Sequence, residues 1–162
     1  MRLAALSLLL IALAGCQLSP VYGGGARSAA ARTLGSIAVP AIPERKGYLV
    51  RQALLDRVDV GEEGARYRLD VALDDAITGF GIRGDDSITR ERRTLRARWQ
   101  LIDTQTGNTL IDETVRADAG IDVVSSDFAV VASETDALER LAEELATDIT
   151  ARIATYAKAR AR

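Results

Sequence analysis

Hydrophobic and polar residues alternate along three stretches in the middle of the chain, and each alternation predicts a β-strand with one buried face. Over residues 67–73 every second position is apolar, with Arg68, Asp70 and Ala72 between them, and residues 89–102 and 110–117 alternate in the same way over part of their length. Successive side chains of a strand point to opposite faces, so each segment has one face for a core and one for solvent. A polar, Gly-containing segment at residues 103–108 predicts a hairpin loop between the last two of these strands.

Two longer segments carry apolar residues at the spacing of an amphipathic helix. Residues 45–58 place Leu, Val and Ala three and four positions apart, with Gly61 available as a stop. Residues 127–162 form a longer stripe, capped by Ser126 and ending in basic side chains that suit the negative end of a helix dipole. A second capping signal at Ser133 leaves a break in this helix open.

A short apolar run at residues 34–39, ended by Pro40 and Pro43, predicts one further strand before the first helix. The predicted order is β-α-β-β-β-α, and its first three elements predict a right-handed crossover. Because the strands are apolar on one face only, both helices are expected there. The sequence predicts an α+β fold of two layers, with two helices packed on one face of a four-stranded mixed sheet.

Glu113 interrupts the pattern, because it falls on the face of its strand that should be apolar. A β-bulge would shift the alternation by one residue, and an edge position would let the carboxylate reach solvent. Both explanations remain open from the sequence.

The start of the chain resembles a bacterial lipoprotein signal. Arg2 precedes an apolar run at residues 3–13, which is too short to cross a bilayer but has the length of a secretory signal. Leu13-Ala14-Gly15-Cys16 then resembles a lipobox, in which the Cys16 thiol forms a thioether with a diacylglyceryl group. In bacterial lipoproteins an Asp after this Cys favours the inner membrane, so Gln17 favours transfer to the outer membrane.

These features divide the chain into three parts. We expect a lipoprotein signal peptide at residues 1–15 and a lipidated N-terminus with a flexible Gly- and Ala-rich linker at residues 16–32. Residues 33–162 are expected to form one α+β domain, a size that supports a real core. The mature protein would be soluble but tethered to a membrane.

Composition removes several function classes. The 162 residues include 21 Lys and Arg, 23 Asp and Glu, and no His, which excludes Ser-His-Asp and Cys-His catalysis and the commonest metal ligand. Once Cys16 carries lipid, no free thiol remains. The net charge of −2 and the few aromatic residues do not favour a nucleic-acid partner. We expect no enzyme activity, no metal and no cofactor beyond the covalent lipid.

Two local motifs resemble a nucleotide-binding site and a metal or acid–base site, but a structural explanation fits each better. Residues 79–84 match GxGxxG, but a dinucleotide site needs a helix directly afterwards and an Arg-rich strand follows, so a flexible hairpin loop is expected. The pairs Asp74-Asp75 and Asp85-Asp86 could ligate a cation or act as acid and base. Adjacent strand residues point to opposite faces, however, so turn and edge roles fit better.

A row of arginines on one strand face is the most unusual feature. Side chains two residues apart on a strand lie about 6–7 Å apart, so these guanidinium forks could contact phosphate or carboxylate groups. Cross-strand pairing with carboxylates is the alternative. The expected open face holds six arginines and four aspartates, an excess of two positive charges: Arg68, Arg90, Arg92, Arg96, Arg98 and Arg116 against Asp70, Asp74, Asp112 and Asp118.

Several separated stretches together resemble the lipopolysaccharide-assembly lipoprotein family LptE, in its alphaproteobacterial form, over nearly all of the mature chain. The sequence departs from the family pattern in three ways. The family often has aromatic residues where Gln17-Leu18 stand, Asn where Gln52 stands, and Tyr where Trp99 and Phe128 stand. The matching residues are Cys16 with Pro20-Val21-Tyr22-Gly23, Arg45-Lys46-Gly47, Leu49 to Arg57, Tyr67-Arg68-Leu69, Gly81-Ile82, Asp85-Asp86-Ser87, Thr94-Leu95, Leu101, Thr106-Gly107, Asp127-Phe128-Ala129, Glu134 to Ala137, Asp148-Ile149 and Arg152.

The resemblance implies a non-enzymatic subunit that sits inside the outer-membrane β-barrel LptD, helps it assemble and binds lipopolysaccharide on its way to the cell surface. It also implies an anchor in the inner leaflet of the outer membrane. The phosphate contacts are expected from Arg90, Arg92, Arg96 and Arg98, with Arg93 and Arg83 as secondary candidates. Two other classes stay open: an auxiliary lipoprotein of an ABC-type lipid transporter, and a periplasmic hydrolase limited to carboxylate chemistry.

Overall fold

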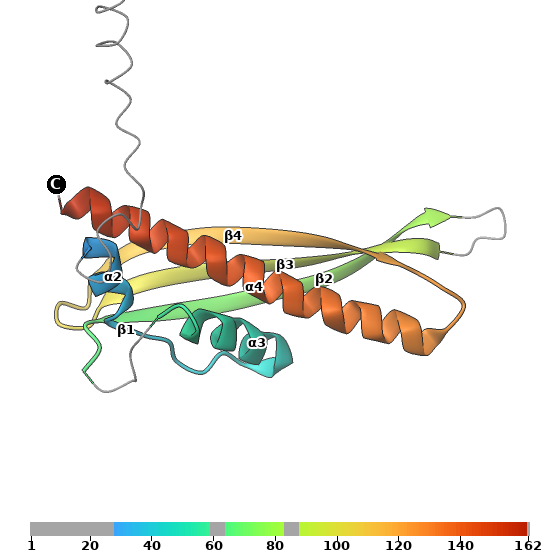
Figure 1. Ribbon diagram of the computed structural model, residues 1–162, viewed down its shortest axis with the longest axis horizontal. Coiled ribbons are helices and arrows are strands. Elements are labelled where there is room, and N and C mark those ends of the chain that lie inside the picture. The colour runs from blue at the N-terminus through green and yellow to red at the C-terminus, as the bar shows by residue number, and fades with distance from the viewer. Residues whose placement is uncertain (1–27, 59–63, 83–87, 162) are drawn as a thin grey trace, which may run out of the picture.

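A computed structural model describes residues 28–58, 64–82 and 88–161 and shows a two-layer α+β fold (Figure 1). The strand order in the sheet is β1-β2-β3-β4, with β1 parallel to β2 and the other neighbours antiparallel. The predicted four-stranded mixed sheet is therefore confirmed. Its elements are α2 (Ala29–Leu34), β1 (Ile37–Ala38), α3 (Glu44–Leu55), β2 (Tyr67–Ile82), β3 (Ile88–Asp103), β4 (Thr109–Asp122) and α4 (Asp127–Arg160).

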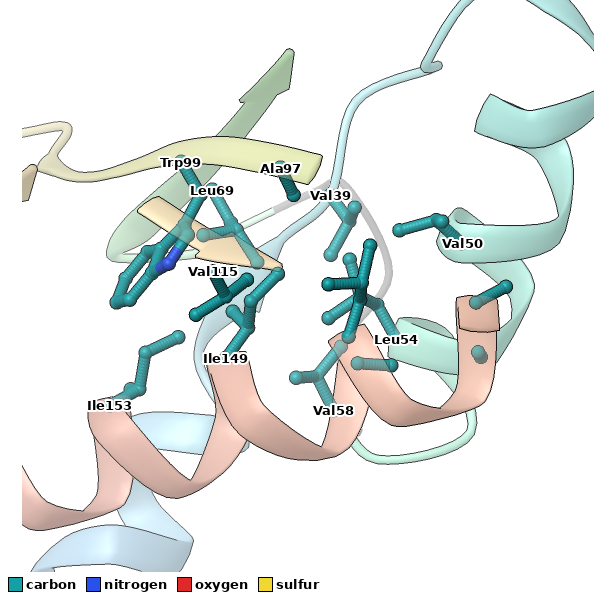
Figure 2. Close-up of a cluster of buried hydrophobic side chains, with 14 of the residues drawn as sticks. Val39, Val50, Leu54, Val58, Leu69, Ala97, Trp99, Val115, Ile149 and Ile153 are labelled. Atoms are coloured by element: carbon teal, nitrogen blue, oxygen red, sulfur yellow. The ribbon is translucent and has the colours of Figure 1, made fainter. Parts of the chain in front are cut away.

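The helices cover one face of the sheet. Figure 1 shows α4 crossing in front of the long strands, and α4 packs against β3, β4, α2 and α3. Figure 2 shows the centre of the core, where Leu69, Trp99 and Val115 of the three long strands face Ile149 and Ile153 of α4. All five side chains are buried. Burying one such large apolar side chain contributes about 1.5–3 kcal/mol, so this layer contact holds the fold together.

The structure corrects the predicted linker. Residues 29–34 form α2, capped by the Ser28 hydroxyl, which accepts from the Ala31 N–H at 3.0 Å. Ala30 and Leu34 are buried against the rest of the core. Residues 28–32 therefore belong to the domain rather than to a flexible spacer, while the remainder of the predicted linker and the signal peptide lie outside the described residues.

The strands differ from their predicted lengths for a tertiary reason. The first strand has only two residues, Ile37 and Ala38, whereas β2 continues to Ile82, well past the clean alternation that ends at residue 73. The extension exists because β3 is long and pairs with β2 as far as Ile82 and Ile88. Residues 79–82 of the GxGxxG segment are strand rather than hairpin loop; residues 83 and 84 lie outside the described part.

Glu113 lies at the edge of the sheet. It stands opposite Trp99 on the helix-covered face of β4, which among the described strands pairs with β3 alone. Its carboxylate accepts from Arg152 of α4 at 2.6 Å. The register also shifts between Leu101 and Ile102, so a β-bulge lies near the start of β4. The edge position, with Arg152 as partner, explains the charge on an otherwise apolar face.

The long C-terminal helix is continuous. The Ser133 hydroxyl donates to the carbonyl of Ala129 at 2.9 Å and does not recap the helix. Helix α4 therefore runs unbroken from Asp127 to Arg160. The described residues contain no helix with both the length and the apolar character of a membrane span.

Candidate anion-binding face of the sheet

The open side of the sheet carries the arginines that the alternation placed there. Arg96 of β3 stands directly opposite Asp74 of β2 and Arg116 of β4, and directly opposed residues of antiparallel strands share a face. The same register places the other arginines beside it. We call this surface, away from the helices, the arginine face, and it carries Arg68, Arg90, Arg92, Arg96, Arg98 and Arg116.

Three of the four arginines predicted to contact phosphate form ion pairs with aspartates of neighbouring strands. Arg96 donates to Asp74 at 3.1 Å, and Arg98 donates to both oxygens of Asp112 at 3.1 and 2.9 Å. Arg90 donates to Asp122 at 2.9 Å, a partner that the sequence pattern had not included. With Asp122, the arginine face has six arginines and five aspartates, so its excess within the described residues is one positive charge rather than two.

Two further arginines pair along their own strands. Arg68 donates to both oxygens of Asp70, at 2.9 and 3.0 Å, and Arg116 donates to Asp118 at 2.8 Å. Asp118 also accepts from the hydroxyl of Thr94 at 2.6 Å. The arginine face therefore carries a network of charged hydrogen bonds.

Arg92 differs from its neighbours. Its guanidinium carbon lies 5.4 Å from the centroid of the Phe80 ring, a cation–π arrangement, and among the residues that the structure describes it has no ion-pair partner. The residues opposite it, Thr78 and Gly120, carry no charge. Arg92 is thus the excess positive charge of the face: an aromatic ring holds it in place of a hydrogen-bonded carboxylate, and its charge acts on Asp118 without a direct ion pair, helping to lower the pKa of that carboxyl.

Hydrogen bonds on the arginine face lower the pKa values of two of its aspartates, Asp112 and Asp118. The pKa of Asp112 is lowered to about 2, chiefly by the Arg98 hydrogen bond and then by Gln100. The pKa of Asp118 is lowered by the hydroxyl of Thr94 and then by Arg116. Both carboxylates therefore stay ionised at any physiological pH and keep their arginines oriented.

These ion pairs are exposed, which leaves them open to exchange. The side chains of Arg90, Arg96 and Arg98 are 64%, 57% and 67% exposed. An exposed pair contributes only about 0.2–1 kcal/mol, so a multivalent anion that contacts several guanidiniums can replace the aspartates. Pairing in the free protein and anion binding are compatible on this face.

Arg93 does not lie on the arginine face, which corrects its prediction as a secondary phosphate contact. It points to the helix-covered face, where its side chain is 11% exposed and donates to Asp75 at 2.6 and 3.0 Å. It also donates to the carbonyl of Glu134 in α4 at 2.7 Å. Arg93 therefore ties α4 to the sheet, while Arg83 and Cys16 lie outside the described residues.

The paired aspartates of β2 are separated as expected. Asp74 joins Arg96 on the arginine face, whereas Asp75 joins Arg93 beneath α4. Within residues 28–58, 64–82 and 88–161, no group of three or more His, Cys, Asp and Glu side chains could hold a metal ion. Each aspartate of the pair is thus engaged by an arginine on its own face of the sheet.

Two residues of the arginine face were not identified from sequence. Phe80 is 40% exposed and supports Arg92, and Asp122 neutralises Arg90. Both lie at strand ends beyond the clean alternation. A longer β2 in the prediction would have placed Phe80 opposite Arg90 and beside Arg92.

Solved structures with the same fold include three bacterial lipoproteins. A candidate lipoprotein from Caulobacter crescentus CB15 is 24% identical, covers 78% of this chain and 93% of its own, and has a TM-score of 0.64. A minor lipoprotein from Acinetobacter baumannii is 19% identical over 74% of this chain and 88% of its own, with a TM-score of 0.56. The uncharacterized lipoprotein B from Nitrosomonas europaea is 12% identical over 74% and 81%, with a TM-score of 0.57.

The comparison with family models carries the assignment. No curated protein matches the sequence. The model of the LptE family, described as lipopolysaccharide-assembly, matches residues 34–153, which span β1 to the last turns of α4. This is most of the chain and includes the whole arginine face. The chain belongs to the LptE family of lipopolysaccharide-assembly proteins.

Proposed function

We propose that this protein is a non-enzymatic lipoprotein of the lipopolysaccharide transport machinery, which binds the phosphates of lipopolysaccharide on its arginine face. The single observation that carries the proposal is the guanidinium of Arg92, which lies over Phe80 without an ion-pair partner among the described residues. It stands in a row with Arg90, Arg96 and Arg98, whose exposed pairs can open. Family membership supports lipopolysaccharide as the ligand.

The order of binding follows from the charges. A lipid phosphate first meets Arg92, because this guanidinium loses no carboxylate on binding. The neighbouring arginines then exchange their aspartates for further phosphate oxygens, at a cost of about 0.2–1 kcal/mol per exposed pair. Such a face holds its ligand loosely enough to release it, as a transport component must.

The cellular setting is also part of the proposal. Cys16 carries the lipid, Gln17 directs the protein to the outer membrane, and the domain occupies the lumen of the LptD barrel and assists its folding. An acyl chain contributes about 0.8 kcal/mol per buried methylene, so a multiply acylated Cys16 anchors the domain stably. Family membership supports this setting.

Lipopolysaccharide binding by charge-reversed variants tests the proposal. Arg92→Glu with Arg96→Glu should reduce binding by at least about tenfold, because two guanidinium contacts become repulsive. Binding by the unaltered protein should fall steeply with salt. The matched control is Arg45→Glu with Arg140→Glu, an equal charge change on exposed residues of the helix layer. Equal losses in both double variants, or no loss in the first, would contradict the assignment to the arginine face.

A further inference from the structure

A second cationic site lies at the opposite end of the molecule from Arg92 and Phe80. A cavity of about 430 Å³ opens between the last turns of α4 and the turn that joins β3 to β4, and Thr33 of α2 lies on its wall. None of its lining residues belongs to the arginine face. The residues that matter for its chemistry are Arg66, Tyr67, Asp103, Tyr156 and Arg160.

Two guanidinium groups are held in this cavity by aromatic rings. Arg66 lies 5.3 Å from the centroid of Tyr67, and Arg160 lies 5.7 Å from the centroid of Tyr156. Arg160 also donates to the Tyr156 hydroxyl at 2.8 Å. Stacking and hydrogen bonding restrict the long arginine side chains, so less freedom is lost when they bind an anion.

The cavity has one positive charge in excess. Asp103 lies 3.5 Å from Arg66, and the same carboxylate accepts from the backbone N–H of Gln105 at 2.9 Å, so the β3–β4 turn shares it. Arg160 has no ion-pair partner within residues 28–58, 64–82 and 88–161. Thr33, Thr106 and Asn108 add neutral hydrogen-bonding side chains to the wall. The chemistry fits a single phosphate group.

The position of the cavity favours a membrane lipid as the source of that phosphate. Helix α2, which supplies Thr33, begins directly after Ser28, where the N-terminal segment with Cys16 joins the domain. Eleven residues lie between Cys16 and Ser28, and this segment spans at most about 40 Å when fully extended. A membrane that holds Cys16 therefore lies within reach of the cavity.

We propose that this cavity binds the phosphate of an anionic phospholipid headgroup and so orients the domain on the membrane to which it is tethered, before the domain enters the barrel. The inference rests on the proposed lipid anchor. The Arg160 guanidinium and the Tyr156 hydroxyl contact the phosphate oxygens, while Arg66 closes the other side. Headgroup binding adds a second contact to the acyl anchor and limits how the domain turns on its linker.

The test uses the full mature lipoprotein in nanodiscs of phosphatidylcholine, with or without phosphatidylglycerol, followed by hydrogen exchange. Phosphatidylglycerol should slow exchange at residues 103–108 and 156–161, and Arg160→Gln should lose this protection. Arg140→Gln removes the same charge from an exposed position of α4 outside the cavity and should keep it. Tyr156→Phe, which removes only the hydroxyl, should weaken it, so the result does not depend on one variant.

Three outcomes would overturn the proposal: equal protection in phosphatidylcholine alone, equal loss in Arg160→Gln and Arg140→Gln, or full protection by inorganic phosphate without phosphatidylglycerol. The last would identify free phosphate as the ligand. Unchanged exchange in β2 and β3 verifies that each variant is folded. Incorporation into phosphatidylcholine discs tests the tether separately, so failure of the anchor and failure of the cavity assignment are distinguishable.

Discussion

Individual side chains of the arginine face are set by their partners. Asp112 accepts two hydrogen bonds from Arg98 and one from Gln100, and all three favour its ionised form. Arg92, which lies two residues before Thr94 on the same face of β3, contacts the Phe80 ring instead of a carboxylate. Arg98 and Arg92 are both arginines of the same strand face, but one binds a carboxylate and the other an aromatic ring. Their roles therefore differ because their partners differ.

The pH dependence of Asp112 is the first residue-scale prediction. Its pKa of about 2 in the folded protein lies below its ordinary value of 3.8, so this interaction stabilises the fold above about pH 4 and is lost as the pH falls towards 2. A carboxyl-carbon NMR titration should show Asp112 still mostly ionised at pH 3. Arg98→Ala should raise the pKa of Asp112 towards the ordinary value, whereas Arg68→Ala should leave it unchanged; no response to Arg98→Ala would contradict the assigned cause.

Gly47 supplies a second residue-scale prediction. A Cβ at this position in α3 would lie 2.5 Å from the carbonyl oxygen of Ile42, closer than any real contact. Gly47→Ala should therefore lower the free energy of unfolding by about 1–3 kcal/mol, because backbone must move. Gly120→Ala is the control, since a Cβ there meets nothing within 4 Å. Chemical denaturation of both variants checks this, and equal stabilities would refute the close approach.

At the scale of elements, the two halves of α4 are held differently. Its fully buried residues begin at Ala137, whereas Phe128 and Val131 in the first turns are 85% and 60% exposed. A hydrogen bond from Arg93 to the carbonyl of Glu134 joins the first part of the helix to the sheet. The C-terminal part packs by apolar burial, whereas the N-terminal part buries less of its surface and adds this polar contact.

Arg93→Met should loosen the start of α4 selectively. Its loss leaves the largely buried Asp75 without its partner, which should reduce stability by about 1–3 kcal/mol. Hydrogen exchange should accelerate at residues 130–136 more than at residues 141–157. Arg90→Met, on the same strand but exposed, should cost at most about 1 kcal/mol. Uniform acceleration along α4 would show that Arg93 is not the specific tie.

At the scale of the whole molecule, the two faces of the sheet have different roles. The helix layer completes the core, whereas the other side of the sheet is left to charged side chains. The long strands extend this surface well beyond α3, as Figure 1 shows. A sheet covered on one side suits a protein that must present a wide surface to a ligand or a larger partner.

Purification from detergent-solubilised outer membranes tests the proposed setting of the whole molecule. The chain should copurify with a β-barrel, and mass spectrometry should find its N-terminus at an acylated Cys16. Cys16→Ala should abolish acylation and reduce recovery with the membrane. Recovery with an inner-membrane ABC transporter instead, or an unacylated protein free in the periplasm, would contradict the proposal.

Much of the fold could be predicted because the signals are local. The alternation over residues 67–73 and 89–102 assigned the buried and open faces correctly, and the register confirms the open-face positions of Arg90, Arg92, Arg96 and Arg98. The same alternation placed Arg93 on the covered face, so its candidacy contradicted the pattern. Helix α2 was missed because its six residues are too short for a periodic signal.

The sequence by itself determined which residues share a face, because side-chain direction in a strand or helix repeats every few residues. Only the tertiary structure decided what each of them meets. Asp122 reaches Arg90 across 32 positions, and Arg160 meets the wall of a cavity built from four other segments. Such meetings depend on strand register and on how layers stack, which arise from contacts far apart in the chain and leave no local repeat.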